Sequence, residues 1–302
     1  MSNVLFDLPG PKARVRHRML AAVGVVAVIA LIAYVVYRFY DSGQFTARKW
    51  EWLQYKQVQE DLLKAVLATL KAFAAGAVLA LVFGAVFAAG RLSDHAWIRG
   101  ISTAVVELFR AIPLLILMFL FYYGLPVVDV RMTPFLAVVL GLTLYNGSVL
   151  AEVFRAGILS LPKGQSEAAY ALGMRKTQVM FFVLLPQAVR AMLPTIVSQL
   201  VVLLKDTALG FLITYEELLY YARFVGSQGA FSRPIVPTTI VIAAIYITLC
   251  LLLTALAKYL EKRNRRNKKI IHPEGGDKVE LTTLTALQPG ATANGLGGAA
   301  PQ

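Results

Sequence analysis

Cysteine and charge are both scarce in this sequence. Its 302 residues include one cysteine, Cys250, so an intrachain disulfide framework is excluded. Only 16% of the residues are charged and 58% are hydrophobic, whereas a soluble domain has about 25% charged residues. The three histidines are scattered in polar flanks and do not form a metal-binding pattern. Despite the net charge of +13, this composition excludes a soluble enzyme, a secreted disulfide-bonded scaffold and a nucleic-acid-binding domain.

Charged residues are absent altogether from five long stretches. These stretches are Met19–Tyr37, Ala72–Gly90, Ala111–Val128, Met132–Ala151 and Pro234–Ala257. As helices they are long enough, or nearly so with their flanks, to cross about 30 Å of hydrocarbon. A sixth apolar stretch, Ala191–Ile213, is interrupted only by Lys205 and Asp206. We therefore predict an all-α polytopic membrane protein with about six transmembrane helices, at residues 19–39, 62–90, 100–126, 132–156, 191–213 and 235–259.

The positive charges lie mainly on one side of these predicted helices. With the N-terminus inside, the inner segments hold 18 Lys and Arg residues and the outer segments hold 7. Because inner loops carry the excess of Lys and Arg in membrane proteins, we predict that both termini are cytoplasmic. The predicted order is a basic tail at 1–18, a transmembrane helix at 19–39, an outer linker at 40–61, a transmembrane domain at 62–260 and a basic, disordered tail at 261–302.

Two segments are expected to lie at the outer surface of the membrane. In the linker, Trp50, Trp52 and Tyr55 are typical of amphipathic rings that anchor a chain in the headgroup layer. Residues 215–231 combine the adjacent Glu216 and Glu217 with apolar side chains. This pattern predicts an amphipathic helix that lies in the interface with both glutamates on its polar side.

The predicted inner loop at 159–190 is too long to be a simple connector. Its first half, QSEAAYALGM, favours a helix that follows Pro162 and stops or turns at Gly173. Its second half, Thr177–Leu185, is apolar and is followed by Pro186, which should end it. We predict a short helix of small side chains facing the cytoplasm, backed by an apolar helix along the membrane. The first helix suits docking against another protein; the alternative is that it rests on lipid.

The loop carries a motif. Glu167–Ala169, three residues, Gly173, nine residues and Val183–Pro186 resemble the EAA signature of bacterial ABC importer permeases, with valine in place of isoleucine. Glu107–Pro113 resembles the E-x-F-R-x-x-P element of the polar amino acid subfamily, and Lys205–Leu209 resembles its K-D-T-S-L element, with alanine for serine. The resemblance covers about residues 62–260. The extra N-terminal helix and long tail are similar to those of actinobacterial glutamate permeases.

The resemblance implies a five-helix permease core behind an N-terminal helix, in the bacterial cytoplasmic membrane. It also implies that the loop helix is a coupling helix seated in a cleft of a separate ATPase, where Glu167 pairs with a basic group and Gly173 permits a sharp turn. The implied partners are two ABC ATPase subunits, a second permease, an extracytoplasmic solute-binding protein and the lipid bilayer, with no nucleic acid. The coupling residues are predicted to be Gly164, Glu167, Ala168, Ala169, Gly173 and Pro186.

The sequence contains no G-x-x-x-x-G-K-[ST] motif, so it has no P-loop to cradle ATP phosphates. We therefore predict no catalytic residue, no metal site and no cofactor bound by this chain. The chain is predicted to be a transport subunit rather than an enzyme, with ATP–Mg bound on the partner ATPase subunits.

Polar and charged residues inside the predicted helices mark candidate sites, because charges within a bilayer are costly and usually functional. For a polar amino acid, Asp206 would meet the ammonium group and Lys205 or Arg110 the carboxylate. For each of these residues a structural ion pair or a gate remains an alternative. The substrate-pathway residues are predicted to be Glu107, Arg110, Asn146, Gln199, Lys205, Asp206 and Thr207. The gate or structural residues are predicted to be Pro113, Glu152 and Arg155.

Together these features predict the transmembrane subunit of an ATP-driven importer for polar amino acids, with glutamate or a close relative as cargo. One alternative is an ion- or proton-coupled secondary transporter that uses Glu107, Lys205 and Asp206. That alternative predicts inverted-topology repeats and broken helices, neither of which the sequence displays, and it leaves the long inner loop unexplained. A membrane scaffold without a transport role is the third hypothesis. Neither the amino acid carried nor the choice between homodimer and heterodimer follows from the sequence.

Overall fold

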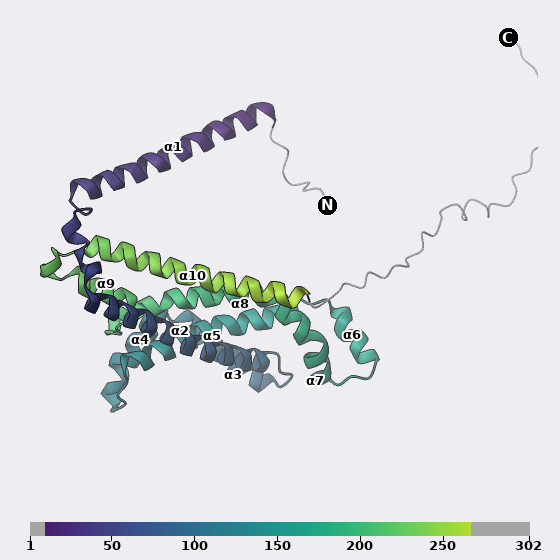
Figure 1. The fold of residues 1–302 in the computed structure, drawn as a ribbon. Helices are drawn as coiled ribbons and strands as arrows, with labels where there is room; N and C mark the ends of the chain where they lie inside the picture. Colours follow the sequence, from purple (N-terminus) through teal and green to yellow (C-terminus); the bar gives the residue numbers. More distant parts are fainter. Residues whose placement is uncertain (1–9, 267–302) are drawn as a thin grey trace, which may run out of the picture. The chain divides into compact units, whose positions relative to one another are not determined.

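The computed structural model describes residues 10–266, and these are helical with short connections (Figure 1). The α-helices are α1 (Pro11–Asp41), α2 (Lys56–Arg91), α3 (Ala96–Ala111), α4 (Leu114–Phe119), α5 (Pro134–Leu159), α6 (Lys163–Ala171), α7 (Lys176–Gln178), α8 (Leu185–Asp206), α9 (Leu218–Gly226) and α10 (Ile235–Arg266). The 3₁₀ or π segments are η1 (Ala47–Lys49), η2 (Glu51–Gln54), η3 (Leu120–Gly124), η4 (Leu125–Val128), η5 (Val179–Leu184), η6 (Thr207–Ile213) and η7 (Gly229–Phe231). Five helices are long and apolar enough to cross a membrane, and a bent pair brings the number to six. The predicted fold class is thus confirmed.

The third predicted span, at 100–126, is wrong as a single helix. Instead α3 and the helical run Leu114–Val128 meet at an angle of 97°. Ile112, between them, has extended backbone (φ −85°, ψ 126°), as expected for a residue that precedes a proline. Pro113 therefore breaks the segment that was predicted as one continuous helix.

The second half of the inner loop also differs from its prediction. Residues Lys176–Ile213 form one helical segment of 38 residues, so the apolar stretch Thr177–Leu185 is continuous with the predicted fifth span and does not form a separate helix. Pro186 does not end a helix but lies in the first turn of α8, where its missing N–H is tolerated. The π-helical turn η5 comes directly before it and absorbs the local mismatch.

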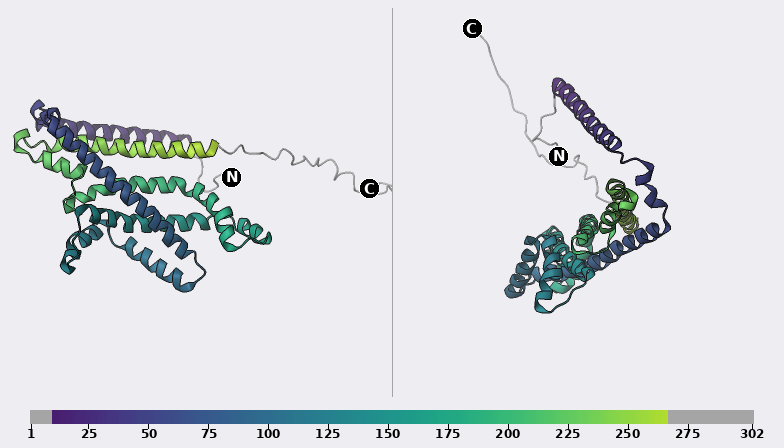
Figure 2. Two further views of the ribbon diagram at one scale, coloured as in Figure 1. Left: turned by 60° about the horizontal axis from the view of Figure 1, so that its bottom comes forward. Right: turned by 90° about the vertical axis from the view of Figure 1, so that its left-hand side faces the viewer.

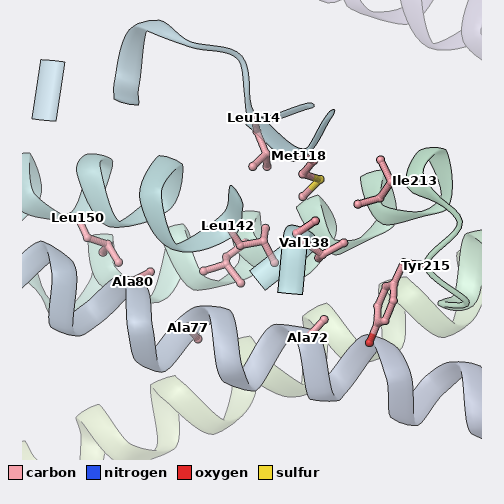
Figure 3. Packing of buried hydrophobic residues seen from close by; sticks show 12 residues of the cluster. Ala72, Ala77, Ala80, Leu114, Met118, Val138, Leu142, Leu150, Ile213 and Tyr215 are labelled. Carbon is pink, nitrogen blue, oxygen red and sulfur yellow. The ribbon is translucent and has the colours of Figure 1, made fainter. Parts of the chain in front are cut away.

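The centre of the bundle is built on close packing of α2 against α5. Small residues on α2, including Ala72, Ala77 and Ala80, face Leu142 and Leu150 of α5 (Figure 3). A Cβ added at Gly84 would lie 2.9 Å from the Cβ of Leu150, closer than side chains come, so only glycine fits at this crossing. Small residues take this role in membranes because they let helix backbones approach.

A second apolar cluster joins the outer linker to α2, α9 and α10. Trp52 is 1% exposed and packs with Ala65, Leu218 and Ile242. The prediction that Trp52 anchors the chain in the headgroup layer is therefore wrong, because the ring is enclosed by protein. Trp50 is half-buried, and its Nε1 donates to the Gln44 carbonyl oxygen over 3.1 Å.

The predicted coupling loop and the predicted outer helix lie at opposite ends of the bundle. Figures 1 and 2 show α6 and α7 at one end and α9 at the other, with α2, α5 and α8 running between them. None of the apolar window of α1 is buried against the rest of the described chain. The tail predicted at 261–302 lies outside the described residues from residue 267 onward.

Candidate functional site

The first candidate site is the loop helix α6. It follows Pro162 directly, as predicted, and it presents the side chains of Glu167 and Ala168 at the surface. Ala169 is 5% exposed, so it faces the chain itself and the prediction that it lies on a docking surface is wrong. The amide Nε2 of Gln187 donates to the Oε1 of Gln165 over 3.3 Å, which ties α6 to the start of α8. This hydrogen bond therefore helps to hold α6, with its exposed Glu167 and Ala168, against the start of α8.

Gly173 ends this helix in the conformation that glycine makes possible. Its φ is +77°, in the left-handed region that side chains disfavour. The N–H of Gly173 donates to the carbonyl of Tyr170 over 2.9 Å, and the N–H of Met174 donates to that of Ala169 over 3.2 Å. This pair of bonds is a Schellman motif. The predicted sharp turn at Gly173 is confirmed.

The second candidate site is a cluster of five charged side chains at the end of the bundle nearest α6. Arg91, the last residue of α2, lies 2.8 Å from Glu152 and 3.4 Å from Glu107. Arg110 lies 3.5 Å from Glu107, and Arg155 lies 2.6 Å from Glu152. The cluster joins α2, α3 and α5 through three arginines and two glutamates, so it carries one net positive charge.

This cluster brings together residues that the sequence had assigned to different roles. Glu107 and Arg110 were predicted for the substrate pathway, and Glu152 and Arg155 for a gate or structural pair. Arg91 connects the two pairs and is only 10% exposed, yet the sequence marked it as nothing more than a charge at a helix end. Its role is set by the packing of α2 between α3 and α5, which no local pattern reveals.

The third candidate site is a hydrogen-bonded group of three polar side chains between α5 and α8. Asn146 is fully buried. Its Nδ2 donates to the Oδ2 of Asp206 over 3.3 Å, and its Oδ1 accepts from the Nε2 of Gln199 over 2.7 Å. The structure thus brings together three of the predicted pathway residues. Their carboxylate and amides offer both acceptors and donors to a polar ligand.

The neighbours of Asp206 in the sequence do not join this group. Asp206 is the last residue of α8, and the chain continues as the 3₁₀ segment η6 within the same helical segment Lys176–Ile213. Lys205 is exposed. Thr207 is fully buried, and its hydroxyl donates to the Leu204 carbonyl oxygen over 2.7 Å. Only Asp206 of these three contacts the buried polar group.

A buried carboxyl group that the sequence did not single out lies at the opposite end, beside α9. Glu217 is 0% exposed and caps α9 by accepting from the N–H groups of Leu219 and Tyr220, both over 2.8 Å. The hydroxyl of Tyr246 on α10 donates to it over 2.6 Å. Burial raises the pKa of Glu217 to about 7. The prediction of Glu217 on a polar helix face is wrong; the adjacent Glu216 is the exposed one.

The chain is similar to known proteins over most of its length. Residues 61–266 match the family described as binding-protein-dependent transport system inner membrane component. The chain is 42% identical, over 75% of its length and 84% of the relative's, to the glutamate transport system permease protein GluD of Corynebacterium glutamicum. It is 33% identical, over 65% of its length and 90% of the relative's, to the probable glutamine ABC transporter permease protein GlnP of Bacillus subtilis.

A solved structure shares the fold. The crystal structure of an amino acid ABC transporter with histidines superposes with a TM-score of 0.64 at 29% identity, covering 70% of this chain and 98% of that one.

Proposed function

Because this chain belongs to the family of binding-protein-dependent transport system inner membrane components, we propose that its cargo is a polar amino acid, glutamate foremost. The chain is a multi-pass permease subunit of an ABC importer. The identity of the cargo is supported by the 42% identity to the glutamate permease GluD. The alternative of an ion- or proton-coupled secondary transporter loses its basis, since the family draws its energy from partner ATPases.

The observation that carries the coupling mechanism is the geometry of α6. A nine-residue helix stands at one end of the bundle with Glu167 and Ala168 exposed, and Gly173 turns the chain sharply back into the fifth span. We expect two ABC ATPase subunits to bind this helix, one on each of two permease subunits that are identical or related. Since the motif sits on the side richer in Lys and Arg, this end is cytoplasmic in the proposal and both termini lie inside.

Transmission to the pathway follows from the connections of α6. It packs on η5, which runs without a break into α8, and α8 carries Gln199 and Asp206. A movement of α6 therefore reaches the buried polar group with Asn146 through one continuous helix. In the proposal, these three residues line the path, and an extracytoplasmic binding protein delivers the amino acid at the opposite end. Nucleotide can drive a conformational change of the transporter only if it binds one conformation with higher affinity than the other.

The roles of the remaining predicted residues follow from where they lie. The charged cluster of Glu107, Arg110, Glu152 and Arg155 around Arg91 serves as the inner gate, because partially exposed ion pairs can exchange partners when helices move. Pro113 supplies the break between α3 and α4. Gly164, where an added Cβ would meet nothing within 4 Å, and Pro186 complete the coupling segment.

A cross-linking experiment tests the coupling proposal. In a Cys250→Ser background, Ala168→Cys is exposed and should cross-link to an ATPase subunit in membranes, whereas the buried Ala169→Cys is the matched control and should not. Uptake of labelled glutamate into proteoliposomes that hold the complete complex should require hydrolysable ATP. Equal cross-linking at both positions, or uptake that persists without ATP, contradicts the proposal.

A further inference from the structure

The described chain has a cavity of about 750 Å³ that none of the sites above uses. It lies between α2, the first turn of α5 and the segment that leads into α9. Its lining includes Lys64, Lys71, Phe135, Glu216 and Phe224. The cavity therefore combines aromatic walls with charges of both signs, which is the composition of a site for a small polar ligand.

The cavity lies at the end of the bundle opposite α6. Twenty residues of α2 separate Lys71 from Arg91 in the inner charged cluster, which corresponds to about 30 Å of helix at 1.5 Å per residue. That length equals the thickness of the hydrocarbon layer. With Arg91 at the inner boundary, as the proposed function has it, Lys71 lies at the outer boundary and is accessible from the extracytoplasmic side.

Two charges in the cavity have no ionic partner within residues 10–266. The ammonium group of Lys71 lies over the ring of Phe135, 4.7 Å from its centre, and no carboxylate lies within 4 Å of it. Glu216 is exposed and has no Lys, Arg or His within that distance in the same part of the chain. Lys64, by contrast, is neutralised by Asp61 at 2.7 Å.

The walls around these charges are fixed by the fold. The hydroxyl of Tyr215 donates to the Ala68 carbonyl oxygen over 2.7 Å, and that of Tyr221 donates to the Val58 carbonyl oxygen over 2.8 Å. Figure 3 shows Tyr215 reaching across to α2 beside Ala72. Because both hydroxyls are already bonded to α2, the two rings act as rigid walls. Lys71 and Glu216 are then the charged groups of the cavity that can form ion pairs with a ligand.

We propose that this cavity is an outer reception site for an α-amino acid zwitterion, in which Lys71 binds the carboxylate group and Glu216 binds the ammonium group. An unpaired cation and an unpaired anion in one cavity match the two charges of the ligand. The site is distinct from the group around Asn146 and would hold the amino acid after its release from the binding protein. The inference rests on the proposed function for its orientation in the membrane and for the class of cargo.

The test is equilibrium binding of labelled L-glutamate to the complete complex in nanodiscs without binding protein. Lys71→Met and Glu216→Gln should each weaken binding about tenfold, the value for one lost charge-assisted hydrogen bond, and Lys71→Arg should restore most of it. Lys56→Met removes the same charge from the exposed start of α2, outside the cavity, and should change nothing.

A second ligand distinguishes the role of Lys71 from that of Glu216. Glutarate keeps both carboxylates of glutamate but has no ammonium group, so its binding should weaken in Lys71→Met and not in Glu216→Gln. Affinities for L-glutamate that match wild type in both variants overturn the inference. A second outcome also overturns the inference. If the variants change nothing except to raise the concentration of loaded binding protein needed for half-maximal uptake, the cavity contacts that protein. If wild type shows no ATP-driven uptake, the proposed function fails, while the binding assay still decides this site.

Discussion

The two ends of the bundle hold their acidic side chains in opposite ways. At the end near α6, Glu107 and Glu152 are partly exposed; both pair with Arg91, and each has a second arginine of its own. At the end near α9, Glu217 is completely buried, has no cationic partner among the described residues and relies on Tyr246 and two backbone N–H groups.

The difference separates contacts that can rearrange from contacts that cannot. Ion pairs between half-exposed side chains exchange partners at little cost because water replaces a lost partner. A buried carboxyl group that loses a hydrogen bond has no such replacement. We therefore expect substitutions near α6 to affect transport first, with a smaller loss of stability than substitutions around Glu217, which affect stability first.

The largest effect is expected at the turn after α6. Gly173→Val places a β-branched residue at φ +77°, where side chains cost roughly 1–2 kcal/mol, and should displace α6 enough to abolish ATP-driven uptake. Gly173→Asn should retain much of the activity because asparagine tolerates this conformation.

Gly229→Ala, outside the coupling segment, is the control for this substitution, since an added Cβ there meets nothing within 4 Å. It should leave uptake and stability unchanged. The apparent melting temperature of Gly173→Val in detergent should remain close to that of wild type. Full uptake by Gly173→Val would contradict both the docking of α6 and the contrast between the two ends.

The second effect concerns pH and the outer end. Burial raises the pKa of Glu217 from 4.5 to about 7, so the folded state holds a proton that the unfolded state loses above pH 4.5. This contribution to stability is complete below pH 4.5 and is lost as the pH rises through about 7, by about 3 kcal/mol in total. Unfolding in detergent between pH 4.5 and 8 measures it.

Glu217→Gln keeps an acceptor for Tyr246 but does not titrate, so its stability should vary much less over this range. Glu216→Gln, one residue earlier and exposed, should keep the slope of wild type. An unchanged slope in Glu217→Gln would show that the outer end does not depend on this carboxyl group.

The smallest effects compare the two glutamates of the inner cluster. Glu152→Gln removes the partner of Arg91, which is 10% exposed, and of Arg155, and should lower the unfolding free energy by about 2 kcal/mol. Glu107→Gln acts on a side chain that is 54% exposed and should cost less than about 1 kcal/mol. Denaturant unfolding in detergent ranks the two, and the reverse order would mean that the shared Arg91 is held mainly by Glu107.

Much of the fold could be predicted because the bilayer imposes it on each segment separately. A charge-free run near 20 residues long must become a helix, whatever surrounds it. The α6 helix and its glycine turn were also local, since Pro162, the alanines and Gly173 determine them within one short stretch. The helix boundaries were predicted wrongly at two prolines, because a proline can either break a helix or lie in its first turn. Pro113 breaks its span, whereas Pro186 is absorbed, and the choice depends on how the flanking helices pack.

The sequence by itself determined the number of apolar helices, the motif of the inner loop and the excess of positive charge on one side. Only the tertiary structure decided that Glu217 is buried while Glu216 is exposed, that Arg91 joins two ion pairs, and that Asn146 meets Gln199 and Asp206. The physical reason is that hydrophobic length and helix caps are properties of neighbouring residues. Burial and charge pairing depend on which helix faces which, and they bring together side chains separated by tens of residues.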